Sequence, residues 1–120
     1  AFGPVTLSDR GVRAALIDGA RLFFAGEHGQ ALSALEPSTV GDGPLQLHVH
    51  LLRSAAQYAL YIRSGEKDQS RRAQAIAEIE KVKGLNPDFE PDARAFAPRF
   101  IAFFRTGHAL AAQAAPPRER

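Results

Sequence analysis

Four histidines are the side chains of this sequence with the widest chemical range, because an imidazole can bind a metal ion or transfer a proton. His48 and His50 are the closest pair. On a helix, residues two positions apart project about 200° away from each other, so this pair cannot share a metal ion. His28 and His108 stand alone, and no histidine has a histidine or glutamate four positions away. We therefore expect no metal site, and we interpret all four as ordinary surface or boundary residues.

Acidic residues alternate through a proline-flanked turn, at Asp88, Glu90 and Asp92. A calcium-binding loop also places carboxylates at alternate positions, but it needs a central glycine and a distal bidentate glutamate, which this segment lacks. Acidic side chains are favourable near the N-termini of helices. We therefore expect Asp88 and Asp92 to act as turn and helix-start residues.

The remaining motifs that could support catalysis are incomplete. The segment Gly-Asp-Gly-Pro at 41–44 could cradle a phosphate, but no predicted strand precedes it and no Lys-Ser/Thr pair follows it. The chain has no cysteine, which excludes a thiol nucleophile, a thiolate zinc site and a disulfide. No serine lies in a nucleophile-elbow sequence. We therefore predict that this chain is not an enzyme and that it binds no cofactor or metal.

The composition favours helices packed around one core. The chain has 120 residues, of which 45% are hydrophobic and 23% charged, and runs of β-branched residues are missing. The net charge of +2 is too small to indicate a nucleic-acid partner. No apolar run reaches the roughly 18 residues that a membrane span needs. We predict a single domain over residues 1–113, followed by a flexible tail or linker over 114–120.

The spacing of apolar residues and the candidate cap residues predict where each helix begins and ends. Ser8 is a candidate N-cap, Gly26 is expected to end the first helix in the left-handed conformation, and Pro44 is expected to open the third. The third helix has apolar residues on most of its circumference, which predicts a place in the centre of the bundle. The predicted segments are helices over 9–25, 27–35, 44–64, 69–84 and 98–113, a loop over 37–44 and a short turn over 91–96.

On the fourth predicted helix, apolar residues recur at helical spacing and should face the core, whereas the charged residues should face solvent. The residues expected to face inward are Ala75, Ile76, Ile79 and Val82. The residues expected to face outward are Glu78, Glu80, Lys81 and Lys83.

Two arginines and a group of phenylalanines have two interpretations each. Arg53 and Arg99 lie among apolar residues, so each could be buried and join helices through carboxylates or helix-end carbonyls; alternatively, Arg53 could project into a groove and bind an acidic partner. The aromatic group could form core or capping surface, or it could line a ligand pocket. Its members are Phe96, Phe100, Phe103 and Phe104.

Two segments carry the same order of small and large apolar residues. In the first, Gly19 is followed by Leu22, by Gly26 at the turn and by Ala31. This order resembles the tetratricopeptide repeat, a helix–turn–helix unit of about 34 residues in which small residues let the helix backbones approach closely. In the second segment the first two places are taken either by Ala55 and Tyr58 or by Ala56 and Ala59, and Ala75 and Pro87 follow after an insertion.

The resemblance implies an all-α fold in which two antiparallel helical hairpins stack side by side and a C-terminal helix caps them. It also implies a bacterial, non-catalytic protein–protein interaction module that binds a peptide or helix in the groove between the hairpins. The partner-binding residues implied by the family pattern are Arg13, Leu16, Ala20, Phe23, His50, Arg53, Gln57 and Tyr61.

A second hypothesis is a structural helical module that forms a homo-oligomer, or docks on a partner, through its Phe-rich C-terminal face. Because two hairpins give only a short groove, the chain is expected to act within a larger chain or assembly. The sequence starts at Ala1 without an initiator methionine, as expected of a processed mature form or an excised domain. The periplasm of a bacterial envelope is slightly favoured over the cytoplasm.

Overall fold

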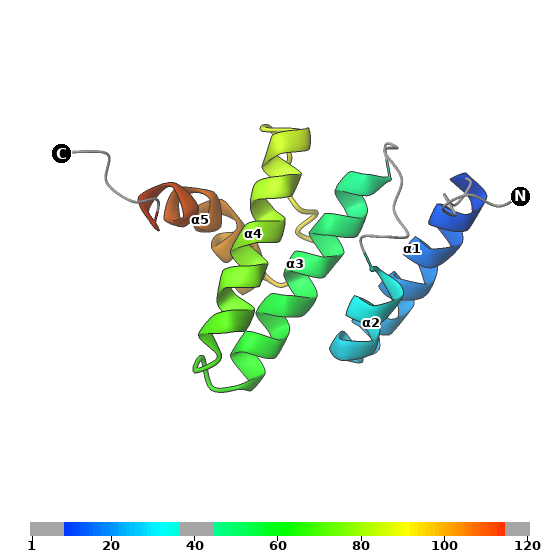
Figure 1. Cartoon of the computed structure of the whole chain (residues 1–120), viewed down its shortest axis with the longest axis horizontal. Helices are drawn as coiled ribbons and strands as arrows, with labels where there is room; N and C mark the ends of the chain where they lie inside the picture. Colours follow the sequence, from blue (N-terminus) through cyan, green and yellow to red (C-terminus); the bar gives the residue numbers. More distant parts are fainter. Residues whose placement is uncertain (1–8, 37–44, 115–120) are drawn as a thin grey trace, which may run out of the picture.

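The computed structural model describes residues 9–36 and 45–114, and over these residues the chain forms helices and no strand. Each helix lies within two residues of its predicted bounds, so the all-α prediction is confirmed. The predictions for Ser8, for the loop over 37–44 and for all but the first residue of the tail lie outside the described residues. The helices are α1 (Asp9–Phe24), α2 (His28–Ala34), α3 (Gln46–Arg63), α4 (Gln69–Leu85) and α5 (Pro98–Ala114) (Figure 1).

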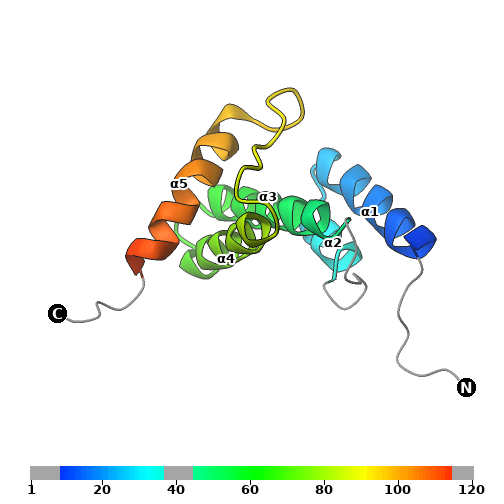
Figure 2. The same cartoon turned by 90° about the horizontal axis from the view of Figure 1, so that it is seen from above.

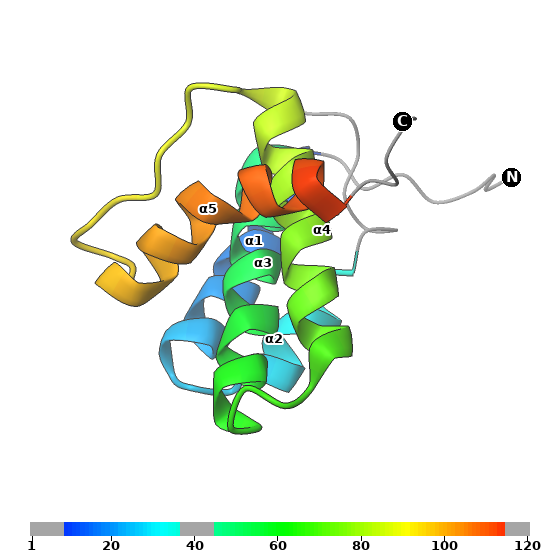
Figure 3. The same ribbon diagram turned by 90° about the vertical axis from the view of Figure 1, so that its left-hand side faces the viewer.

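The helices pack in pairs that follow the order of the chain. α1 packs against α2, α3 packs against α4, and α2 also contacts α3. α5 lies across α4, as the views from above and from the side show (Figures 2 and 3). α3 contacts α1, α2 and α4, and nine of its 18 residues are buried. This confirms the prediction that its wide apolar surface places it in the centre of the bundle.

α1 and α3 end in the same kind of turn, at Gly26 and Gly65. The N–H of Gly26 donates to the carbonyl of Phe23, and the N–H of Glu27 donates to the carbonyl of Leu22. The same pair of bonds surrounds Gly65. The two glycines have φ angles of 86° and 78°, which only glycine adopts at little cost. Both helices therefore end in a Schellman motif, and the predicted end of the first helix at Gly26 is confirmed.

Close packing between α1 and α2 depends on Gly19. This glycine is buried, and a Cβ atom added to it would lie 2.4 Å from Cγ of Leu35. On α3, Ala55 and Ala56 are also buried, with exposed fractions of 3% and 0%. The prediction that a small residue allows close approach of the helices is therefore confirmed at Gly19, and Ala55 and Ala56 are buried rather than exposed to solvent.

We expect Gly19→Val to lower the free energy of unfolding by about 1–3 kcal/mol, because the added side chain must displace Leu35, which is only 1% exposed. The matched control is Gly29→Ala on α2, where an added Cβ meets nothing within 4 Å. That change should stabilise the chain by roughly 0.5–1 kcal/mol. Urea unfolding followed by circular dichroism measures both effects. Equal effects of the two substitutions would contradict the packing described for Gly19.

A core cluster joins α3, α4 and α5. Phe100 and Phe104 belong to it, with exposed fractions of 5% and 0%. Phe103 is half-buried and stacks on Tyr58, with ring centroids 4.3 Å apart. The interpretation of these phenylalanines as core is therefore confirmed for Phe100 and Phe104. The buried members of the cluster are Leu51, Ala55, Ile79, Val82, Phe100 and Phe104.

Arg99 corrects one of our expectations, because it is exposed rather than buried. It lies in the first turn of α5, next to Phe100, which takes the core-facing position. Its side chain keeps 61% of its surface exposed and donates to Oε2 of Glu66 at 2.8 Å. The contact between α5 and the turn after α3 is therefore a surface ion pair.

The segment between α4 and α5 contains the turn predicted at Asp92. Oδ1 of Asp92 accepts a hydrogen bond from the backbone N–H of Arg94 at 2.8 Å. Its carbonyl accepts from the N–H groups of Ala95 and Phe96, both at 3.0 Å. Asp92 is thus a turn residue, as predicted.

Candidate functional site

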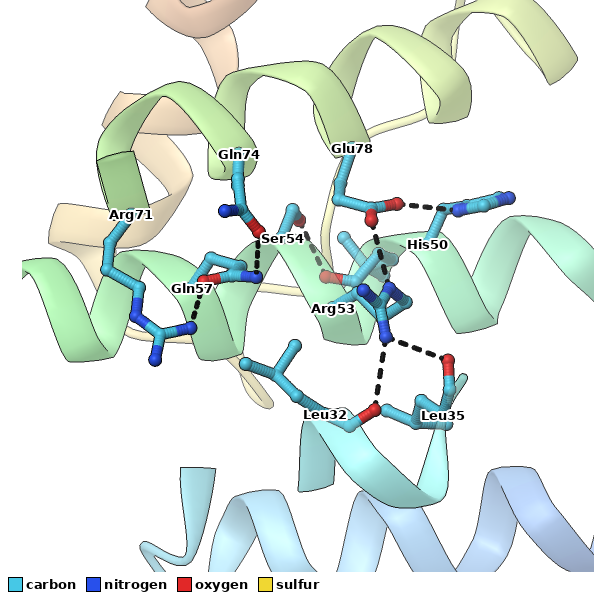
Figure 4. A network of polar contacts seen from close by, with 10 residues as sticks. Leu32, Leu35, His50, Arg53, Ser54, Gln57, Arg71, Gln74 and Glu78 are labelled. Carbon is cyan, nitrogen blue, oxygen red and sulfur yellow. Dashed lines mark hydrogen bonds and ion pairs between the residues drawn. The ribbon is translucent and has the colours of Figure 1, made fainter. Parts of the chain in front are cut away.

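A row of polar side chains lies on the buried side of α3. His50, Arg53, Ser54 and Gln57 are spaced so that they fall on neighbouring turns of the same helical face. Figure 4 shows them pointing toward α4 and toward the end of α2. His50, Ser54 and Gln57 are buried, with exposed fractions of 5%, 0% and 2%. Buried polar groups require partners; α4 supplies them for His50 and Gln57, and α3 itself supplies one for Ser54.

Glu78 of α4 is the centre of this polar network. Its Oε1 lies 2.6 Å from Nδ1 of His50, and its Oε2 accepts from Nε of Arg53 at 2.9 Å. Burial by itself raises the pKa of the Glu78 carboxyl, but the hydrogen bonds and positive charge of its two partners outweigh burial and lower the pKa overall. The carboxylate is therefore ionised and both of its oxygens are occupied, so it is poorly suited to act as a general base.

Arg53 links this carboxylate to a third helix. Its Nη1 donates to the carbonyls of Leu32 and Leu35 at 3.1 and 3.0 Å. These carbonyls lie at the C-terminal end of α2, where a helix leaves backbone acceptors without internal partners. The interpretation of Arg53 as a buried residue that joins helices through a carboxylate and helix-end carbonyls is therefore confirmed (Figure 4).

Gln57 extends the network toward the start of α4. Its Nε2 donates to Oε1 of Gln74 at 2.8 Å, and its Oε1 accepts from Nη1 of Arg71 at 2.9 Å. The hydroxyl of Ser54 donates to the carbonyl of Leu51 in the same helix at 2.6 Å. Both ends of the Gln57 amide are therefore satisfied within the chain.

The outward orientation predicted for Glu78 is wrong, because the side chain is 6% exposed. The sequence contains a signal that could have found it. Glu78 lies three positions after Ala75 and four before Val82. This spacing places it on the same, core-facing side of α4 as those two apolar residues. Its partners His50 and Arg53 show the matching spacing of three on α3. His50 is likewise buried, not a surface or boundary residue.

An apolar groove lies on a different face of α3. It has a volume of about 460 Å³ and is bounded by the end of α1, the second half of α3 and the start of α5. Phe24 is 57% exposed there, and its ring lies 6.0 Å from that of Phe96. We call this the aromatic groove. It is lined by Phe23, Phe24, Gly26, His28, Ala55, Tyr58, Ala59, Ile62, Ala95, Phe96, Ala97, Arg99 and Phe100.

The predicted partner-binding residues of α1 lie in three different environments. Phe23 lines the aromatic groove. Leu16 and Ala20 are half-buried and pack against a small core cluster of α2 and α3. Arg13 is exposed. Only one of these four therefore lies at the groove.

The predicted partner-binding residues of α3 lie away from the aromatic groove. His50, Arg53 and Gln57 belong to the polar network. Tyr61 is buried, with 9% of its surface exposed. The first three side chains therefore make contacts within the chain, and Tyr61 leaves little surface for a partner.

His28, the first residue of α2, lines the aromatic groove with one unsatisfied nitrogen. Its Nδ1 is buried and has no hydrogen-bond partner among the residues that the structure describes. Its ring centroid lies 5.3 Å from that of Phe23. Burial, followed by the positive charge of Arg63, lowers the pKa of His28, while Glu27 acts in the opposite direction. Neutral His28 therefore contributes a largely apolar ring to the groove.

Neither a metal centre nor a membrane-spanning helix occurs within residues 9–36 and 45–114. No three histidine, cysteine or acidic side chains gather there in a way that could hold a metal ion. Over the same ranges, no helix combines the length and the hydropathy that crossing a bilayer requires.

No protein-family model matches this chain, and no curated protein and no solved structure is significantly similar to it. Function is therefore inferred from the geometry of the aromatic groove and of the polar network.

Proposed function

We propose that this chain is a non-catalytic protein-interaction module that holds an apolar segment of a peptide or helix in the aromatic groove. The observation that carries the proposal is the gathering of aromatic rings around an open hollow, with Phe24 more than half exposed. Exposed apolar patches on a concave surface are typical of interaction sites. Aromatic side chains in such hollows supply much of the binding energy of protein interfaces.

A tetratricopeptide-like, antiparallel stack of hairpins is part of the same proposal. Two features support it: the matching Schellman turns at Gly26 and Gly65, and the close helix approach at Gly19 together with the burial of Ala55. In such a stack the groove is lined by the first helix of each hairpin. Here those helices are α1 and α3, which both border the aromatic groove.

On α3, we assign partner contact to the residues that line the aromatic groove. The repeat register in which Ala56 and Ala59 take the first two places would instead put partner contact on His50, Arg53 and Gln57, whose side chains are engaged within the chain. The lining residues of α3 are Ala55, Tyr58, Ala59 and Ile62.

We expect Phe24→Asp to weaken peptide binding by about tenfold or more, because it places a charge in the aromatic groove and removes an exposed ring. Folding should be little affected, since Phe24 is 57% exposed. The probe is a helical peptide selected from a random library against the unmodified chain, with binding followed by NMR chemical-shift changes.

Arg13→Ala is the matched control for this experiment, because Arg13 is exposed on the same helix but does not line the groove. We expect it to leave peptide affinity nearly unchanged. Selected peptides that shift resonances away from the groove, and that bind the Phe24→Asp variant as tightly, would refute the proposed site.

The alternative, docking through a Phe-rich C-terminal face, has less support. Phe100 and Phe104 are core residues, and Phe103 is stacked on Tyr58. The phenylalanines described on α5 therefore offer little surface to a second copy or to another protein.

A further inference from the structure

The charges at the aromatic groove narrow the chemistry of its partner. Among the described residues that line it, Arg99 is the only one with a permanent charge. None of these lining residues is acidic. An apolar segment bound in the groove therefore meets one positive side chain and no negative one along its walls.

Arg99 is paired within the chain, but the pair leaves it accessible to a partner. Its Nη2 donates to Oε2 of Glu66 at 2.8 Å, and the two side chains are 61% and 53% exposed. An ion pair with that much exposure contributes little to stability. A guanidinium also has five N–H donors, so Arg99 can donate to a carboxylate of a partner while it remains beside Glu66.

Arg63 adds a second positive charge at the same end of the groove. It is the last residue of α3 and directly follows Ile62, which lines the groove. Arg63 is exposed and forms no ion pair with the described residues. We call Arg63, Glu66 and Arg99 the arginine corner. It has two positive charges and one negative charge, so it is positive overall.

Two nearby groups act against an anion, and neither outweighs the arginine corner. The C-terminal end of α3 has a partial negative charge, which Arg63 in the last turn offsets. Glu27 does not line the groove, and its Oε1 accepts from Nε2 of Gln30 at 3.3 Å. The start of α5, which does line the groove, has the positive end of the helix dipole and no acidic residue in its first turn.

Aromatic rings can also bind a cation, but the rings of this groove are packed on one another. The centroid of Phe23 lies 5.0 Å from that of Phe24 and 6.0 Å from that of Phe96. The centroids of Phe24 and Phe96 are also 6.0 Å apart. Rings at these separations are in contact, so they form a continuous wall rather than a cage around a cation. The arginine corner disfavours a cationic partner as well.

We propose that the aromatic groove binds a peptide or helix whose apolar segment is flanked by acidic residues, with a carboxylate beside Arg63 and Arg99. The inference rests on the proposed function and adds the charge of the partner. Charged groups at the rim of an interface act mainly on specificity and on the association rate. We therefore expect a moderate preference for acidic flanks that depends on salt.

Three versions of the helical peptide selected from the random library test the proposal. They share the apolar residues and differ only at the flanking positions, which are all glutamate, all glutamine or all lysine. At low ionic strength the glutamate version should bind about fivefold more tightly than the glutamine version. The lysine version should bind more weakly than both. In about 1 M salt, where the screening length is roughly 3 Å, most of the difference should disappear.

Arg63→Gln and Arg99→Gln test whether the arginine corner causes the preference. Each variant should lower the ratio of the two affinities, glutamate version to glutamine version, and the double variant should bring it close to one. Affinity for the glutamine version should be nearly unchanged, because the rings of the groove remain. Arg13→Gln is the matched control, since it removes one charge from an exposed residue that does not line the groove. It should keep the ratio of the unmodified chain.

The outcomes separate this proposal from the proposed function. Equal affinity for the glutamate and glutamine versions, or a preference for lysine, would overturn the acidic partner. If Phe24→Asp then still weakened binding of all three peptides, the aromatic groove would remain the binding site. A ratio that Arg13→Gln lowers as much as Arg99→Gln would reflect net charge alone and would also overturn the proposal. If no library peptide bound at the groove, both proposals would fail.

Discussion

Replacing Glu78 by alanine should lower the free energy of unfolding by about 3 kcal/mol, the lower end of the range for breaking a buried ion pair. The substitution leaves the Arg53 guanidinium, whose side chain is 12% exposed, and the buried Nδ1 of His50 without their acceptor. Arg53 would retain its bonds to the end of α2, but its charge would have no opposite charge beside it. Urea unfolding at neutral pH measures the loss.

Glu90→Ala is the matched control for this prediction, because Glu90 also accepts from an arginine, Arg105, at 2.9 Å. That pair is exposed, with 49% and 64% of the two side chains accessible, so its removal should cost about 1 kcal/mol or less. If the two substitutions cost the same, burial of the Glu78 pair would not be the source of its effect.

The dependence of stability on pH is a second test of the buried ion pair of Glu78. The pKa of Glu78 in the folded chain lies below its ordinary value of 4.5, so the unfolded chain takes up the proton first as the pH falls. The stabilisation is therefore fully present above about pH 4.5 and is lost as the pH falls toward the lower folded value. The Glu78→Ala chain should lack this part of the acid-side loss. An identical acid profile in both chains would contradict the assignment.

Replacing Phe104 by aspartate should unfold most of the chain. Removing a fully buried phenylalanine costs roughly 3–5 kcal/mol, and placing a charge in the remaining cavity adds to that cost. Phe104 is 0% exposed, and it contacts the rings of Phe89 and Phe100. Circular dichroism should show loss of helix, and size-exclusion chromatography should show an expanded chain.

Phe24→Asp is the control for this substitution, since it makes the same chemical change at a residue that is 57% exposed. It should leave the helix content unchanged. The comparison also separates the two functional hypotheses. A Phe104→Asp chain that stayed folded, and that changed from a dimer to a monomer, would support docking through the C-terminal helix and contradict a core role for this ring.

The helices could be predicted from the sequence because each has local signals that the structure keeps. Gly26 ends α1, and Pro98 begins α5, as their backbone preferences require. The close approach at Gly19 could also be predicted, because a glycine within a helix lowers its stability and is usually kept there for close packing. The exposure of Arg99 could not be predicted in the same way, since its side chain pairs with Glu66, a residue 33 positions away.

The sites were harder to predict because they depend on pairs of helices. The charge of Glu78 predicts exposure to solvent, whereas its spacing from Ala75 and Val82 places it on the buried side of α4. Only the packing of α3 on α4 brings His50 and Arg53 to it. The aromatic groove likewise combines residues of α1, α3 and the segment before α5. No single periodic pattern contains that combination, so the face of α3 that borders the aromatic groove could not be predicted from the sequence.

The bonds from Arg53 to the end of α2 determine which helices of this chain could be duplicated or recombined together. α2 has only seven residues, fewer than an isolated helix needs to persist in water, and its last carbonyls are satisfied by a side chain of α3. If residues 9–36 were duplicated alone, the copy of α2 would have no arginine to donate to its last carbonyls, because Arg53 lies on α3. Recombination that divides the chain between α2 and α3 would therefore separate α2 from the arginine that donates to its last carbonyls, so α1, α2 and α3 would have to be transferred together.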